Sequence, residues 1–150
     1  ISFFVDISDE RHPWPVANFQ VPALPVRSGD PDFCERGVFG PHAPHASHSP
    51  IYEGKMLALA YFTGGVRLID MRDPFKPVEI GAFIAKATPN SRVIYPPNPP
   101  PDVKPWPVIN NVEVDERGRY IYAVDRPSNG LYVLEITGKA AAMLKPAGAK

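Results

Sequence analysis

The chain is poor in the features that most directly reveal a chemistry or a compartment. It has one cysteine, Cys34, in 150 residues, so no disulfide can form within it, and a lone cysteine does not fix the redox compartment. Sixteen Lys and Arg balance sixteen Asp and Glu, which leaves no positive excess for nucleic acid or an anionic membrane surface. No apolar run approaches the roughly 18 residues that a transmembrane helix needs. We therefore expect neither a nucleic-acid partner nor a transmembrane segment.

Proline and glycine, by contrast, are abundant. The chain has 20 prolines and 11 glycines, a content that opposes long helices and favours short strands joined by ordered turns. Short runs rich in Val, Ile, Leu, Tyr and Phe alternate with turn signals, so the sequence predicts an all-β fold. Strands are expected at residues 1–7, 17–21, 56–62, 66–71, 78–84, 109–115, 120–125 and 131–136.

The sequence also repeats itself about every 65 residues. Asp6, Asp9 and Pro13 recur as Asp70, Asp73 and Pro77, each 64 positions later. Residues 120–124 and 130–135 resemble residues 55–59 and 65–70 at an offset of 65. A β-sandwich would not repeat its turn chemistry at a fixed offset, whereas a β-propeller of four-stranded antiparallel blades would. We therefore predict a propeller-like fold with about two blades present.

This prediction divides the chain into blades and loops. Two blades cannot close a ring, so the chain is expected to be a fragment, an open two-sheet unit or a partner in an oligomer, completed by other blades or subunits of the same assembly. The predicted segments are a partial blade at 1–21, a long loop at 22–50, a blade at 51–84, a loop at 85–107, a blade at 108–138 and a flexible tail at 139–150.

Four segments resemble the LVIVD-repeat β-propeller proteins. They are Phe4-Val5-Asp6-Ile7-Ser8-Asp9, Gly40-Pro41-His42-Ala43-Pro44-His45, the run from Tyr61 to Pro74, and the run from Asp125 to Glu135. The resemblance implies the C-terminal blades of a longer member and, since that bacterial family is commonly exported, an extracytoplasmic (periplasmic or secreted) location. The chain departs from the family pattern at Glu10 and at Ser47-His48. The family is largely uncharacterised, so the resemblance implies a fold rather than an activity.

One loop holds the candidate metal ligands. His42, His45 and His48 follow a His-x-x-His-x-x-His spacing in a stretch rich in Gly and Pro, and imidazole is the commonest protein ligand for Zn, Cu and Fe. Cys34 or Glu35 could add a further ligand. Loops with Pro-His-x-x-His near a metal also occur in propellers of the selenium-binding, methanethiol-oxidase type, to which this loop is loosely similar. The alternative is that the histidines hydrogen-bond backbone groups and hold the loop over the sheet.

Other polar residues allow a ligand site or a structural role. Asn110, Asn111 and Arg126 could line a central channel, although the two asparagines could instead cap the loop after Pro107, and Arg126 could form an ion pair with Asp125.

The repeated aspartates have a structural explanation. Asp6, Asp9, Asp70 and Asp73 recur with the same turn, which favours side-chain hydrogen bonds to turn backbone because an active site is made once per protein.

Aromatic residues beside prolines could either form a partner surface or cover the ends of the sheets; they are Trp14, Phe75, Tyr95 and Trp106.

The function predicted from these observations is a non-catalytic scaffold or interaction module whose loops, 22–50 and 85–107, contact a partner. The alternative is a metal-dependent enzyme, redox or hydrolytic, with His42 and His45 as partial ligands. A third hypothesis is the binding of an organic ligand in the central channel.

Overall fold

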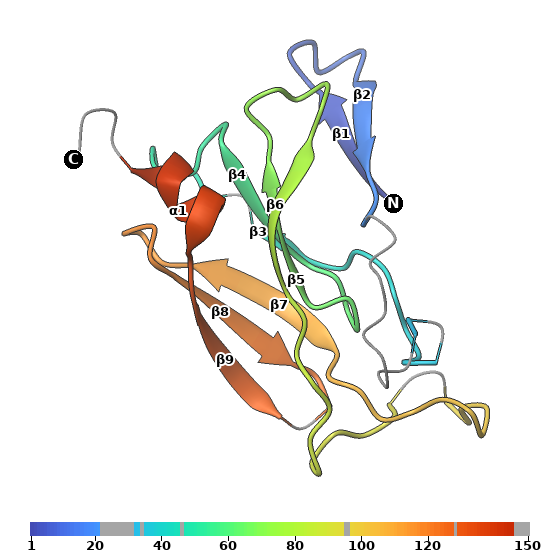
Figure 1. The fold of residues 1–150 in the computed structure, drawn as a ribbon. Coiled ribbons are helices and arrows are strands. Elements are labelled where there is room, and N and C mark those ends of the chain that lie inside the picture. Colours follow the sequence, from blue (N-terminus) through green and yellow to red (C-terminus); the bar gives the residue numbers. More distant parts are fainter. Residues whose placement is uncertain (22–31, 34, 46, 95–96, 128, 146–150) are drawn as a thin grey trace.

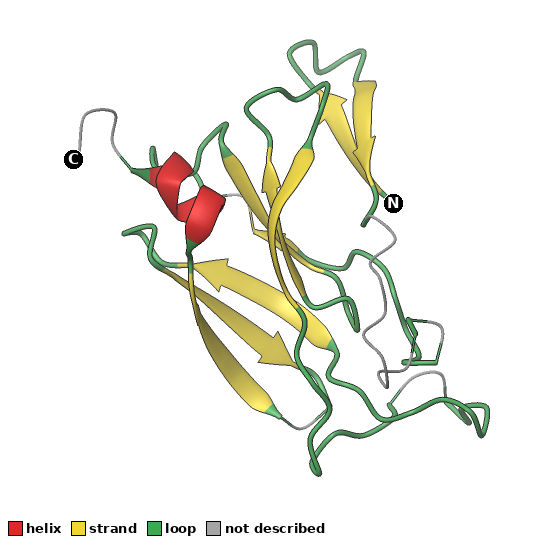
Figure 2. Cartoon of the chain, viewed as in Figure 1, coloured by secondary structure: helices red, strands yellow, loops and turns green. Residues whose placement is uncertain are grey.

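The computed structural model describes residues 1–21, 32–33, 35–45, 47–94, 97–127 and 129–145. These residues form three antiparallel sheets and one short helix (Figures 1 and 2), so the predicted β-rich, antiparallel class is confirmed. The strands do not close into a barrel or a ring of blades within this part of the chain.

The sheets have two, four and three strands in sequential order, as meanders with short connections do. The first is a hairpin, the second a four-stranded sheet and the third a three-stranded sheet. The strands are β1 (Ser2–Asp6) and β2 (Trp14–Phe19); β3 (Pro44–His45), β4 (Met56–Ala60), β5 (Val66–Asp70) and β6 (Val78–Phe83); and β7 (Ile109–Val114), β8 (Tyr120–Asp125) and β9 (Gly130–Glu135).

Strand β3 corrects the predicted loop at 22–50. Pro44 pairs with Leu59 and His45 with Ala58, so the end of that loop adds an edge strand to the sheet. A sequence pattern does not reveal this strand because it is two residues long and contains a proline, which lacks an N–H and is tolerated at a sheet edge. Residues 22–31 of the predicted loop lie outside the described residues.

The hairpins β1–β2 and β5–β6 have the same pairing, 64 positions apart. Ser2 pairs with Phe19 as Val66 pairs with Phe83, and the remaining pairs follow in step to Asp6–Trp14 and Asp70–Val78. Both hairpins also have an irregularity at the same place, between Phe4 and Val5 and between Leu68 and Ile69. The two hairpins therefore share register and bulge as well as sequence.

The aspartates form the predicted turn hydrogen bonds. The Asp6 carboxylate accepts from the Ser8 N–H at 2.8 Å, and Asp70 accepts from the Arg72 N–H at 3.1 Å. The next aspartate in each copy does the same, because Asp9 accepts from Arg11 and Asp73 from Phe75. These bonds satisfy turn N–H groups that have no partner in the ladder.

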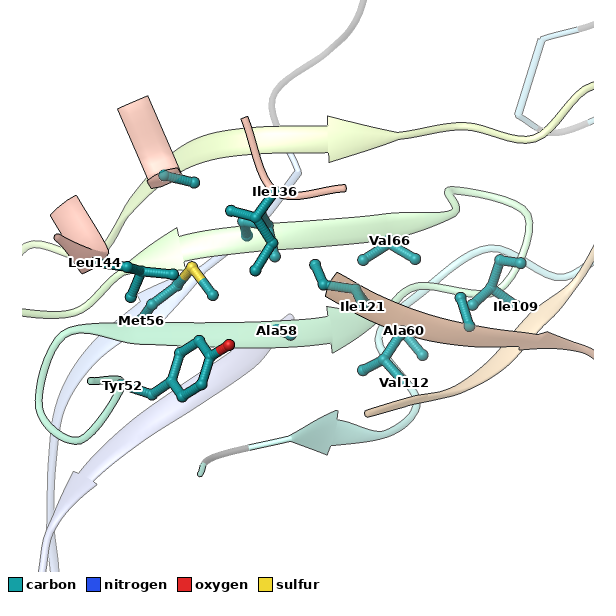
Figure 3. Close-up of a cluster of buried hydrophobic side chains, with 13 residues drawn as sticks. Tyr52, Met56, Ala58, Ala60, Val66, Ile109, Val112, Ile121, Ile136 and Leu144 are labelled. Carbon is teal, nitrogen blue, oxygen red and sulfur yellow. The ribbon is translucent and has the colours of Figure 1, made fainter. Parts of the chain in front are cut away.

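The main core lies between the sheets β3–β6 and β7–β9 (Figure 3). Alternate residues of β4, such as Ala58 and Ala60, face Ile109, Val112 and other residues of the third sheet, and all four are buried. Burying one such Val or Ile side chain contributes about 1.5–3 kcal/mol. This packing joins the two sheets face to face.

A second core covers the opposite face of the same middle sheet. Phe19 of β2 packs with Leu59, Tyr61 and Ile69, all of them buried, and Phe4 joins them from β1. The middle sheet is therefore apolar on both faces, and the described chain has three layers: hairpin, four-stranded sheet, three-stranded sheet (Figure 1).

The expected tail from residue 139 instead begins with a helix. Residues Gly138–Leu144 form α1, which buries Ala140 and Leu144 in the main core and contacts β6. The alanine-rich run Ala140-Ala141-Ala142 suits a helix, and the open border between the two sheets provides the apolar surface that a short helix needs. Residues 146–150 lie outside the described part of the chain.

Replacing Gly65 by alanine tests the tight turn between β4 and β5. Gly65 has a φ of +81°, and a Cβ there would lie 2.0 Å from the Phe83 carbonyl oxygen. Gly130 also has a positive φ of +88°, but nothing lies within 4 Å of its Cβ position. We expect Gly130→Ala to lower the free energy of unfolding by about 1 kcal/mol, the strain alone, and Gly65→Ala by about 3 kcal/mol. Equal losses in urea unfolding would contradict the close approach.

The pairing of Asp70 with Arg72 predicts a loss of stability in acid. The Arg72 side-chain hydrogen bond holds the pKa of Asp70 below its usual range. Above about pH 4 the carboxylate is ionised in both states and the full stabilisation is present; below it the unfolded chain binds the proton first, so stability falls as pH falls. Asp70→Asn and Arg72→Met should both flatten this slope in urea titrations between about pH 4 and pH 2. An unchanged slope in both variants would show that the pair does not contribute.

Candidate functional site

The histidine loop lies against the first strand of the third sheet. The backbone N–H of His42 donates to the Ala60 carbonyl at 2.9 Å, and its Nδ1 lies 2.7 Å from the Asn110 carbonyl oxygen. A carbonyl oxygen only accepts, so Nδ1 carries the proton, and Nε2 is the acceptor of the neutral ring. The ring also packs 4.6 Å from the Phe62 ring. His42 therefore links the loop to β7 through a backbone contact.

His45 connects the same two sheets through a charged group. It lies on β3, its side chain is 25% exposed, and its Nδ1 is 2.6 Å from the Glu113 carboxylate on β7. At this distance the ring donates to the carboxylate. This pair joins β3 of the middle sheet to β7 of the third sheet, so both side chains have a structural role.

The predicted site residues are brought together only in part. His42, His45 and Asn110 lie along the contact between the loop and β7, and the Asn110 amide donates to the Asn111 side chain at 2.8 Å. His48 is exposed. Arg126 is exposed, and its backbone N–H donates to the Val108 carbonyl at 2.9 Å.

No three side chains of His, Cys, Asp or Glu gather as a metal site within the described residues. Cys34 lies outside those residues. Glu35 is engaged elsewhere: its carboxylate accepts from the Asp32 N–H at 3.0 Å and lies 3.8 Å from the Lys104 ammonium. His42 and His45 are held by Asn110 and Glu113 rather than by each other.

A buried carboxylate, Asp125, organises the far end of the third sheet through backbone and amide hydrogen bonds. Asp125 accepts from the Val108 N–H at 2.6 Å and from the Asn129 backbone and amide at 2.8 and 2.6 Å. Asn129 in turn contacts Thr88 and Ser91 of the loop 85–107. An aspartate four residues before Asn-Gly, at a hairpin turn, is the local signal for this role.

The four aromatic residues beside prolines have different environments. Trp106 is buried at 6% exposure and stacks under the Arg36 guanidinium at 4.1 Å, which favours the covering role. Trp14 and Phe75 are 70% and 69% exposed and remain open to a partner. Tyr95 lies outside the described residues.

A small apolar cavity lies between β5, β6 and β9, beside α1. Its volume is about 110 Å³, and it is lined mainly by Val66, Leu68, Phe83 and Leu134. Organic ligands bind in cavities of roughly 300–1,000 Å³, so this space is a packing gap. The predicted channel residues Asn110, Asn111 and Arg126 do not line it.

Comparisons with protein-family models, with curated proteins and with solved structures find no match for this chain. Within the described residues, no helix combines the length and the apolar character needed to cross a membrane.

Truncating the histidines tests their role as links between the sheets. We expect His42→Ala to lower the free energy of unfolding by about 1 kcal/mol, because the Asn110 carbonyl loses its donor. His45→Ala should cost somewhat less, since exposed ion pairs contribute up to about 1 kcal/mol. His48→Ala, at an exposed position, is the control and should change stability by less than about 0.5 kcal/mol. Equal effects of the three variants in thermal unfolding would contradict the assignment.

Proposed function

We propose that this chain is a section of an LVIVD-type β-propeller that acts as a non-catalytic scaffold or interaction module within a larger chain or assembly. The observation that carries the proposal is the shared register and bulge of hairpins β1–β2 and β5–β6 at an offset of 64. Repeating units of this kind cannot bury their own apolar faces and are stabilised by their neighbours. Such a module would act by binding partners through its sheet faces and loops.

The order of the layers supports the same proposal. In a propeller, consecutive blades stack face to face around an axis. Here the hairpin packs on one face of the middle sheet, and the third sheet packs on its other face. Strands β1 and β2 of the hairpin correspond to β5 and β6 of the middle sheet, and strands β7, β8 and β9 correspond to β3, β4 and β5. Successive copies of one four-stranded blade would give this correspondence.

The polar contacts at the loop favour a structural role over catalysis. His42 Nδ1 and His45 Nδ1 are each occupied by a group on β7, which holds the loop in place. The metal-dependent enzyme remains the alternative proposal. It would require the Nε2 atoms of both rings to converge on one ion with further ligands.

Metal analysis separates the two proposals. For the scaffold, protein purified without chelator should carry the same metal content as the His42→Ala/His45→Ala variant, and the variant should only be less stable. About one Zn, Cu or Fe per chain that is lost in the variant would favour the enzyme instead.

The scaffold proposal also predicts association. One chain has a mass of 16.5 kDa, and exposed apolar sheet faces favour contacts between molecules. Light scattering over a range of concentrations should therefore give a mass above that of one chain. A single species of 16.5 kDa at every concentration would contradict the proposal.

A further inference from the structure

The outer face of the third sheet carries an uncovered apolar cluster on β8 and β9, flanked on β7 by Asn111 and Glu113. Four side chains on β8 and β9 point away from the main core, at exposures of 38%, 45%, 58% and 58%. They form what we call the sheet face: Tyr122, Val124, Leu131 and Val133.

The middle sheet shows what covers such a face. Val124 pairs with Leu131 in the third sheet as Ala60 pairs with Val66 in the middle sheet, and Tyr122 pairs with Val133 as Ala58 pairs with Leu68. The register therefore matches β8 to β4 at an offset of 64, not the expected 65, and β9 to β5 at 65, since the β8–β9 turn is one residue longer. The positions in the middle sheet have exposures of 0%, 1%, 0% and 7%, because the third sheet packs on them. The sheet face therefore stands where the next antiparallel sheet would pack.

The hairpin β1–β2, at the other end of the stack, also has an uncovered apolar face, on its side away from the middle sheet. Phe3 and Val5 of β1 are 67% and 47% exposed, while Phe4 between them packs inward. At the offset of 64 that the two hairpins share, they correspond to Arg67 and Ile69, which are fully buried. We call Phe3 and Val5 the hairpin face.

The chain uses the same contact between its layers. The inner side of the hairpin, with Phe4 and Phe19, packs on the side of the middle sheet that carries Ile69. The equivalent inner side of β5–β6, with Leu68 and Phe83, packs on the third sheet. In each layer, the side that carries Phe4 or its equivalent Leu68 packs on the next layer along the chain. We call this side the leading side of a layer, and the side that carries Ile69 or its equivalent Val5 the trailing side.

By this rule the two uncovered faces are complementary. The sheet face is the leading side of the last layer, and the hairpin face is the trailing side of the first. The four sheet-face residues lie on two strands of the three-stranded sheet, and the hairpin that would cover them has two strands.

Resting on the proposed function, we propose that the occupant of the sheet face is the hairpin face of a second copy of this chain. The contact is head to tail, so it joins two different surfaces and extends into a closed ring or an open row of copies. Tyr122, Val124, Leu131 and Val133 of one copy pack on Phe3 and Val5 of the next, at the roughly 10 Å spacing of stacked sheets.

Two charged variants test the contact. The sheet-face variant is Leu131→Lys/Val133→Lys, and the hairpin-face variant is Phe3→Lys/Val5→Lys. The control is Val78→Lys, whose side chain is 49% exposed, closely matching Val5 at 47%. All five positions are exposed, so circular dichroism should report an unchanged fold for the three variants.

Analytical ultracentrifugation then measures self-association. The wild-type chain and the control should associate, and each face variant alone should associate at least about tenfold more weakly. An equimolar mixture of the two face variants should form a dimer with one copy of each, identified by native mass spectrometry. Each of these copies retains the face that the other needs.

The outcomes separate the inference from the proposed function. If the sheet-face variant is monomeric and the mixture does not recover a dimer, the face pairs with itself or with another surface, and the head-to-tail contact is overturned while the scaffold stands. If the control weakens equally, the association is unspecific and the inference falls. A monomeric wild-type chain would overturn both.

Discussion

Burial of the middle sheet on both of its faces is the constraint on which the rest of this structure depends. Along β4, Ala58 and Ala60 point to one core, while Leu59 points to the other. Such a strand has no side for water, so two further layers must cover it. The hairpin β1–β2 covers one face, and the third sheet with α1 covers the other. The three-layer order follows from this requirement.

Polar side chains form contacts both between two layers and within a single sheet. His45 and Glu113 join β3 to β7, and Asp125 holds the Val108 N–H at the base of the third sheet. The fully buried Arg67 donates to the Gly64 carbonyl at 2.9 Å and lies 3.4 Å from Glu79, while burial lowers its pKa. Desolvated pairs of this kind contribute little net stability, but losing one partner is costly. His45–Glu113 joins two sheets, whereas the contacts of Arg67 lie within the middle sheet.

The histidine loop bears on the proposed assembly because it helps to complete the middle sheet. A loop tied down by His42 and His45 keeps β3 at the edge of the middle sheet, where it completes a four-stranded layer. A completed layer presents an apolar face on each side, and the neighbouring layers pack on these faces. In the proposed assembly, the histidines hold the shape of the scaffold, and the apolar faces at the two ends of the stack are the surfaces proposed to contact other copies.

The sequence by itself determined the β class, most strand positions and the turn role of Asp6, Asp9, Asp70 and Asp73, because alternation, turn residues and short-range hydrogen bonds are local properties. It did not reveal β3, since a two-residue strand with a proline forms only where β4 offers an edge. It indicated no more than one helical turn at residues 139–144 in an otherwise flexible tail, whereas α1 spans Gly138–Leu144 because two sheets create an apolar border there. The partners of His42, His45 and Asp125 lie up to 68 positions away in sequence. Only the tertiary structure could decide those contacts, because no local pattern specifies which carbonyl or carboxylate the packing of distant strands brings within reach.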